Sequence, residues 1–90
     1  MLITWDDRKN EANYNKHGVW FEEAQTIITE PLTLSNTNDH PGGDRMEYLG
    51  FSWENRLLYV VTVEKDGDEI RIISARLATR NERMSYEEGI

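Results

Sequence analysis

Cysteine is absent from the 90-residue chain, which excludes disulfides and thiolate metal sites. No apolar run approaches the roughly 18–20 residues that span a bilayer. The first residues, MLITWDDRK, turn acidic at once and lack the layout of a signal peptide. These features predict a single domain over residues 1–90, located in the cytoplasm, with no membrane association. A chain this short buries a modest core, so a partner subunit could matter to it.

Basic residues are also scarce, with 10 Lys and Arg against 17 Asp and Glu, and a net charge of −7. This balance excludes a broad nucleic-acid-binding surface and suits a basic protein partner. One segment departs from it, because residues 71–83 contain four arginines and a single glutamate. The segment predicts either a local patch that can hold a few phosphates or a set of surface ion pairs.

The first elements are a short strand and a polar helix. Residues 2–5 are β-branched and aromatic in the manner of a strand. Residues 7–17 predict a helix that Asp6 or Asp7 can cap and that Gly18 ends. This helix is polar nearly all round, so tertiary hydrogen bonds or a partner must hold it in place.

Four polar residues share one face of this helix: Lys9, Asn13, Lys16 and His17. Such a stripe can present hydrogen-bond donors to an anion. It can equally be a solvated face, or its members can cap the ends of neighbouring strands.

Residues 21–29 predict a second helix whose apolar stripe faces a core. Trp20 stands at its N-cap, where Ser or Thr would complete a capping box with Glu23. Because an indole accepts no hydrogen bond, the ring must serve packing or contact a partner.

The remainder of the chain is turn-rich and then strand-rich. Ser35–Asp44 predicts a mobile loop, in which Asp39, His40 and Asp44 lack a recognised ligand spacing, so no metal site is expected. Strands are predicted at 45–53, 57–63 and 70–75, and Pro31–Leu34 can form an earlier one.

Thr79 and Glu82 form a capping box for a C-terminal helix over residues 80–88. The element order β-α-α-β-β-β-β-α predicts a compact α+β domain. We expect an antiparallel sheet of about four strands, with two N-terminal helices and one C-terminal helix.

Two separated segments resemble the BrnT toxin family. WDDRKNEANYNKHGVWFEEA is similar to the family opening W-D-x-x-K-x-x-x-N-x-x-K-H-G-V-x-F-E-E-A, and IRIISARLATRNERMSYEE to its ending R-I-I-S-A-R-x-A-x-x-x-E-x-x-x-Y. Trp20 departs from the Ser or Thr usual in the family.

The resemblance implies a RelE-like fold and a type II toxin, a ribonuclease that cleaves RNA and inhibits translation. It further implies a hetero-oligomer with a cognate BrnA-like antitoxin, whose DNA-binding part would reach the operator.

Metal-independent RNA cleavage needs a base, an acid and cations, and no cofactor. His17 and Tyr86 are the candidates for proton transfer, with Glu82 or Glu47 as carboxylate alternatives. The catalytic set is completed by Arg76 and Arg80. The predicted phosphate contacts are Lys9, Lys16, Arg45 and Arg71.

Structural alternatives stand beside these roles. His17 can fix the end of its helix, Tyr86 can be a buried core ring, and Arg76 can pair with Glu82 or Asp6. The whole domain can also be a non-catalytic binding module that docks an antitoxin or another basic partner through Trp20.

Overall fold

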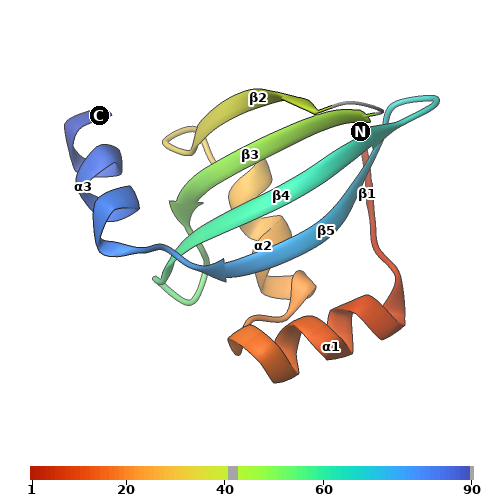
Figure 1. Ribbon diagram of the computed structural model, residues 1–90, viewed down its shortest axis with the longest axis horizontal. Helices are drawn as coiled ribbons and strands as arrows, with labels where there is room; N and C mark the ends of the chain where they lie inside the picture. Colours follow the sequence, from red (N-terminus) through yellow and green to blue (C-terminus); the bar gives the residue numbers. More distant parts are fainter. Residues whose placement is uncertain (41–42, 90) are drawn as a thin grey trace.

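The computed structural model describes residues 1–40 and 43–89, and of residues 38–40 and 43–44 it describes the backbone alone. One sheet carries three helices (Figure 1). The elements are, in order, β1 (Leu2–Thr4), α1 (Asp7–His17), α2 (Phe21–Ile28), β2 (Leu34–His40), β3 (Gly43–Phe51), β4 (Leu57–Lys65), β5 (Glu69–Leu77) and α3 (Arg80–Gly89). This order confirms the predicted β-α-α-β-β-β-β-α sequence of elements.

The sheet has five strands in the order β1-β5-β4-β3-β2. The prediction of about four antiparallel strands is therefore wrong in two respects. The four later strands pair antiparallel, but β1 adds a fifth strand that runs parallel to β5. The chain passes through α1, α2 and three strands before β5 forms, so no local pattern could indicate this parallel pairing.

The predicted loop over Ser35–Asp44 is also wrong at both ends, because strand β2 runs from Leu34 to His40 and its partner β3 begins at Gly43. The earlier strand expected at Pro31–Leu34 begins only at Leu34. Residues 41–42 and the side chains of Asp39, His40 and Asp44 lie outside the described residues.

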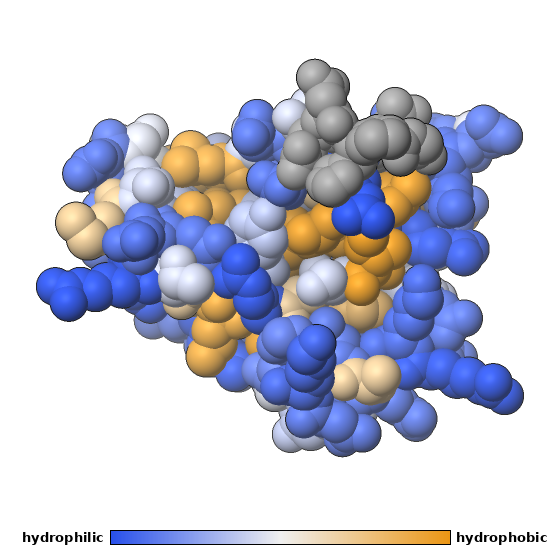
Figure 2. All heavy atoms as spheres, in the orientation of Figure 1, coloured by the Kyte–Doolittle hydropathy of each residue, from blue (hydrophilic) through white to orange (hydrophobic). Residues whose placement is uncertain are grey.

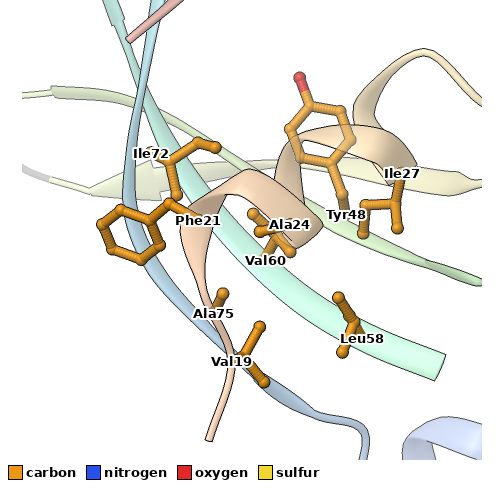
Figure 3. Close-up of a cluster of buried hydrophobic side chains, with 9 residues drawn as sticks. All are labelled: Val19, Phe21, Ala24, Ile27, Tyr48, Leu58, Val60, Ile72 and Ala75. Atoms are coloured by element: carbon orange, nitrogen blue, oxygen red, sulfur yellow. The ribbon is translucent and has the colours of Figure 1, made fainter. Parts of the chain in front are cut away.

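Helix α2 covers one face of the sheet and forms the core with it (Figures 1 and 3). Its apolar stripe packs on core-facing residues of β3, β4 and β5, as the helical periodicity of the sequence predicts. The buried cluster consists of Val19, Phe21, Ala24, Ile27, Tyr48, Leu58, Val60, Ile72 and Ala75.

A bulge in β5 decides which side chains reach the other face. Val61 pairs with Ser74 but Thr62 pairs with Ile72, so the register shifts by one residue between them. Arg71 and Arg76 are five residues apart, a spacing that would put them on opposite faces of a regular strand. Because of the bulge, they point to the same face, opposite α2.

Tertiary hydrogen bonds hold the polar helix α1, as its sequence requires. The Asn13 amide donates to the carbonyl oxygens of Val19 and Ala75, each at 2.8 Å, and accepts from the Ala75 N–H at 3.1 Å. The Asn13 side chain thus takes the place of a neighbouring strand at the outer edge of β5. One member of the predicted polar stripe is therefore a structural residue, 8% exposed.

Asn10 supplies the cap that Trp20 cannot give to α2. Its Oδ1 accepts from the Phe21 N–H at 2.7 Å, and its Nδ2 donates to Glu22 at 2.8 Å. Trp20 makes no side-chain cap hydrogen bond and stacks on Tyr14, with ring centroids 4.1 Å apart. The indole thus packs locally on Tyr14 but stays 41% exposed, and partner contact through Trp20 stays a prediction.

Candidate active site

The face of the sheet that α2 leaves uncovered carries the polar residues of the candidate site. Figure 1 looks onto this open face, and Figure 2 shows hydrophobic residues over the middle of the sheet with hydrophilic residues around them. Tyr59 of β4 lies across from Arg76 of β5. Glu47 of β3 lies across from Val61, two residues further along β4 and on the same face. The open face thus gathers an acid, a phenol and a guanidinium from three strands.

Tyr59 is the centre of this group. The Arg76 guanidinium lies over its ring, with its central carbon 4.3 Å from the ring centroid. Burial, together with a hydrogen bond to the Glu47 carboxylate, raises the pKa of Tyr59 to about 12. The phenol is therefore protonated at neutral pH and can donate its hydrogen.

Glu82 orients Arg76 through a two-pronged ion pair. Nη1 and Nη2 of Arg76 donate to the two carboxylate oxygens at 2.8 and 2.9 Å. The same carboxylate accepts from the Thr79 N–H at 2.8 Å, which confirms the predicted capping box of α3. Hydrogen bonding from Arg76 lowers the pKa of Glu82 although burial opposes it. The start of α3 and the position of Arg76 thus depend on one carboxylate.

Two further arginines lie on the open face. Arg45 of β3 and Arg71 of β5 both pair with Val63 of β4, so their Cα atoms are about 10 Å apart, twice the strand spacing. Arg71 is also 3.5 Å from Glu69, whose carboxylate accepts from Thr4. Arg80 is exposed at the first turn of α3. The structure therefore brings Arg45, Arg71 and Arg76 to one face, with Arg80 on the adjoining helix.

The basic residues of α1 lie elsewhere. Helix α1 runs along the outer edge of β5, to which Asn13 binds it (Figure 1). Lys9 and Lys16 are exposed on this helix, and His17 is half-buried in its last turn. These three residues flank the edge of the sheet and do not belong to the group around Tyr59.

Tyr86 is a buried ring, as expected if its role is structural and not catalytic. It is 4% exposed and packs edge-on against Phe51, with centroids 5.5 Å apart. Its hydroxyl donates to the carbonyl oxygen of Leu32 at 3.0 Å. This tyrosine fastens α3 to the turn before β2, and Tyr59 is the one that places a hydroxyl on the open face.

A cavity of about 410 Å³ adjoins the site, between α3 and strands β2, β3 and β4. Tyr59, Glu47 and Glu82 reach it from the site. Its other walls carry amides, hydroxyls and apolar groups, from Leu34, Ser35, Asn36, Tyr48, Leu49, Asn81 and Ser85. The cavity surface is mainly apolar, and its volume is large enough for part of a ligand bound at Tyr59.

Sequence reasoning missed Tyr59, although a signal for it existed. Because side chains alternate between the faces of a strand, Tyr59 faces away from the core that Leu58 and Val60 enter, and the Asp-Gly turn sets β4 against β5. The residue across from Arg76 could thus have been found from the hairpin, had its register been known. The bulge made that register unpredictable.

Among the side chains that the structure describes, within residues 1–37 and 45–89, no group of three or more His, Asp and Glu is placed to hold a metal ion. Nor does this part of the chain contain a helix with the length and apolarity to cross a membrane.

Comparison with known proteins places the chain among the ribonuclease toxins of type II toxin–antitoxin systems. The model of the family described as "Ribonuclease toxin, BrnT, of type II toxin-antitoxin system" matches residues 5–82. The chain therefore belongs to the BrnT family, and membership implies an antitoxin partner.

The fold is similar to that of a solved structure. It is the crystal structure of the Brucella abortus ribonuclease toxin, BrnT, with 21% sequence identity and a TM-score of 0.67. The match covers 89% of this chain and 99% of that one. The comparison with curated proteins yields no match.

Proposed function

We propose that this toxin is a metal-independent endoribonuclease that cleaves RNA on the open face of the sheet and so inhibits translation. The observation that carries the proposal is the arrangement around Tyr59. A protonated phenol contacts both a carboxylate, Glu47, and a guanidinium, Arg76, on an exposed sheet face. These are the three kinds of group that transesterification of RNA requires.

Each group has a role in the proposed reaction. The Glu47 carboxylate takes the proton of the ribose 2′-hydroxyl, and the 2′-oxygen attacks phosphorus. The bond from phosphorus to the 5′-oxygen breaks, and Tyr59 gives its proton to that oxygen. The products are a 2′,3′-cyclic phosphate and a 5′-hydroxyl. Arg76 stabilises the negative charge that develops on the phosphate oxygens between these states.

Arg45, Arg71 and Arg80 are proposed to bind the neighbouring phosphates, and Lys9 and Lys16 to contact RNA that extends past the edge of β5. The cavity beside Tyr59 is of a size to take a nucleobase. Because the chain as a whole has a charge of −7, binding depends on these local cations and should weaken steeply as salt is raised.

His17 stays a prediction for proton transfer, as does Tyr86, and both belong in the same test. The buried position of Tyr86 favours a structural role. Neutralisation by a BrnA-like antitoxin, operator binding through that antitoxin, the cytoplasmic location and the RelE-like classification of the fold are further parts of the proposal.

The test is cleavage of an end-labelled RNA by the purified chain, with and without EDTA. We expect cleavage in both, with cyclic phosphate ends. Glu47→Gln and Tyr59→Phe should each slow cleavage by about 10²–10⁴-fold, the usual contribution of a general acid or base. Arg83→Gln, an exposed arginine of α3, is the matched control and should cleave as the wild type does.

Two outcomes would contradict parts of the proposal. Cleavage that survives both substitutions would show that Glu47 and Tyr59 do not transfer protons in the reaction, and His17→Gln would then be the variant to measure. A folded wild-type chain that leaves RNA intact would favour the non-catalytic binding module.

A further inference from the structure

A groove of about 900 Å³ lies on the other side of the molecule, away from the Tyr59 site. The residues that line it belong to α2, the end of α1 and the turn that joins β3 to β4. The Arg56 guanidinium ties that turn down, since it donates to the Gly18 carbonyl oxygen at 3.1 Å and pairs with Glu23. The groove is thus a fixed feature of the fold.

Three aromatic side chains line the groove and are exposed. Tyr14 and Trp20 form a stacked pair in which each residue is 41% exposed. Trp53, at the tip of the turn, is 86% exposed. A tryptophan this exposed contributes little to the core, and aromatic residues in a groove are the usual anchors of a protein interface.

The charges around these rings are acidic. The groove carries Glu22, Glu23 and Glu54 with one cation, Arg56. Arg56 is paired with Glu23, so the Glu22 and Glu54 carboxylates determine the local charge. Acidic charge repels RNA, although the rings could otherwise stack bases. It also disfavours a second copy of this chain, whose net charge is −7.

We propose that this groove binds a segment of the antitoxin that carries Lys or Arg side chains. The cations would lie against the faces of Trp53 and Trp20, and their ends would reach Glu22 and Glu54. The proposal rests on the proposed function in taking an antitoxin as the partner. It adds the place of docking and the chemistry of the segment.

This placement separates two surfaces. The RNA site lies on the open sheet face, and the groove lies beside α2, which covers the opposite face. A substitution in the groove should therefore change the affinity for the antitoxin and leave RNA cleavage by the free toxin unchanged.

The experiment measures binding of the purified antitoxin encoded beside this toxin, by titration calorimetry, and RNA cleavage by the free toxin variants. Trp53→Ala should weaken antitoxin binding by about 30-fold or more, the loss typical of an interface hot spot. Glu54→Lys should weaken it at low salt, with a smaller effect at high salt. Leu32→Ala, which truncates another exposed apolar side chain, and Glu64→Lys are the matched controls and should bind as the wild type does.

Unchanged antitoxin affinity in both Trp53→Ala and Glu54→Lys would overturn the proposal. So would a loss of RNA binding in Trp53→Ala, which would make the groove a nucleic-acid surface, or a loss of self-association, which would make it an interface between copies. If the free wild-type toxin does not cleave RNA, the proposed function fails, but the calorimetry still decides the role of the groove.

Discussion

Replacing Asn13 by alanine should destabilise this toxin far more than expected for a polar residue in a helix that is polar nearly all round. Asn13 is the buried link between α1 and β5, with three hydrogen bonds to main-chain groups of Val19 and Ala75. The alanine variant leaves two carbonyl oxygens and one N–H without their partner. It also frees the outer edge of β5, next to Arg76.

The magnitude follows from these three groups. A buried polar group that loses its partner costs about 1–3 kcal/mol. Asn13 is near an edge, so water can reach some of the groups, and we expect a total loss of about 2–4 kcal/mol from the free energy of unfolding. Such a loss is a large fraction of the roughly 5–15 kcal/mol that stabilises a typical domain. Asn13→Asp should cost at least as much, because a carboxylate oxygen would face two carbonyl oxygens.

Urea unfolding followed by circular dichroism measures this loss. Asn15→Ala is the matched control, since Asn15 is an exposed asparagine of the same helix, and its effect should be within about 0.5 kcal/mol of zero. If Asn13→Ala proved as stable as Asn15→Ala, the argument that these hydrogen bonds hold α1 to the sheet would be refuted.

Three further predictions concern the site and the packing beneath it. Glu82→Gln should be less stable than wild type at neutral pH: the pKa of Glu82 is lowered chiefly by its hydrogen bond from Arg76, so its contribution is present above the ordinary value of 4.5 and is lost as pH falls through the folded value. Unfolding curves of the two proteins should converge as the pH is lowered, and a constant gap would contradict this ion pair. In Tyr59→Phe, the alkaline absorbance titration should lose its highest step, because the wild-type phenol has a pKa of about 12. The stability that the neutral phenol contributes to the wild type is present below pH 10 and declines above it. Gly50→Ala should destabilise by about 1–3 kcal/mol, since the added carbon would overlap the Thr33 hydroxyl and lie 3.0 Å from Thr33 Cβ; urea unfolding equal to wild type would mean that Thr33 can move aside.

Much of the fold could be predicted because its signals are local. The capping box of Thr79 and Glu82 marks the start of α3, Gly18 ends α1 in the left-handed conformation, and the stripe on α2 identifies its core face. The site could be predicted only in part. Arg71 and Arg76 are recognisable as candidates because arginines are concentrated in residues 71–83 of a chain that has few basic residues. The pairing of Tyr59 with Arg76 could not be predicted, because it depends on the register of β4 against β5.

Capping shows where local reasoning ends. The missing half of the capping box at Trp20 is visible in the sequence, and so is the need for something to hold the polar helix α1. Asn10 of α1 meets both needs at once, because it caps α2 and thereby holds α1 against it. Whether a residue can do this depends on how the two helices lie together in space.

By itself, the sequence determined the order and type of the elements, the family, and the local concentration of arginine, because each depends on residues that are close along the chain. The tertiary structure alone decided that β1 pairs parallel with β5 and that Asn13 completes an edge 62 residues away. It also decided, through a one-residue bulge, that Arg71 and Arg76 share a face with Glu47 and Tyr59. The physical reason is that hydrogen-bond register between distant strands is set by packing of the whole sheet, and a shift of one residue exchanges its faces.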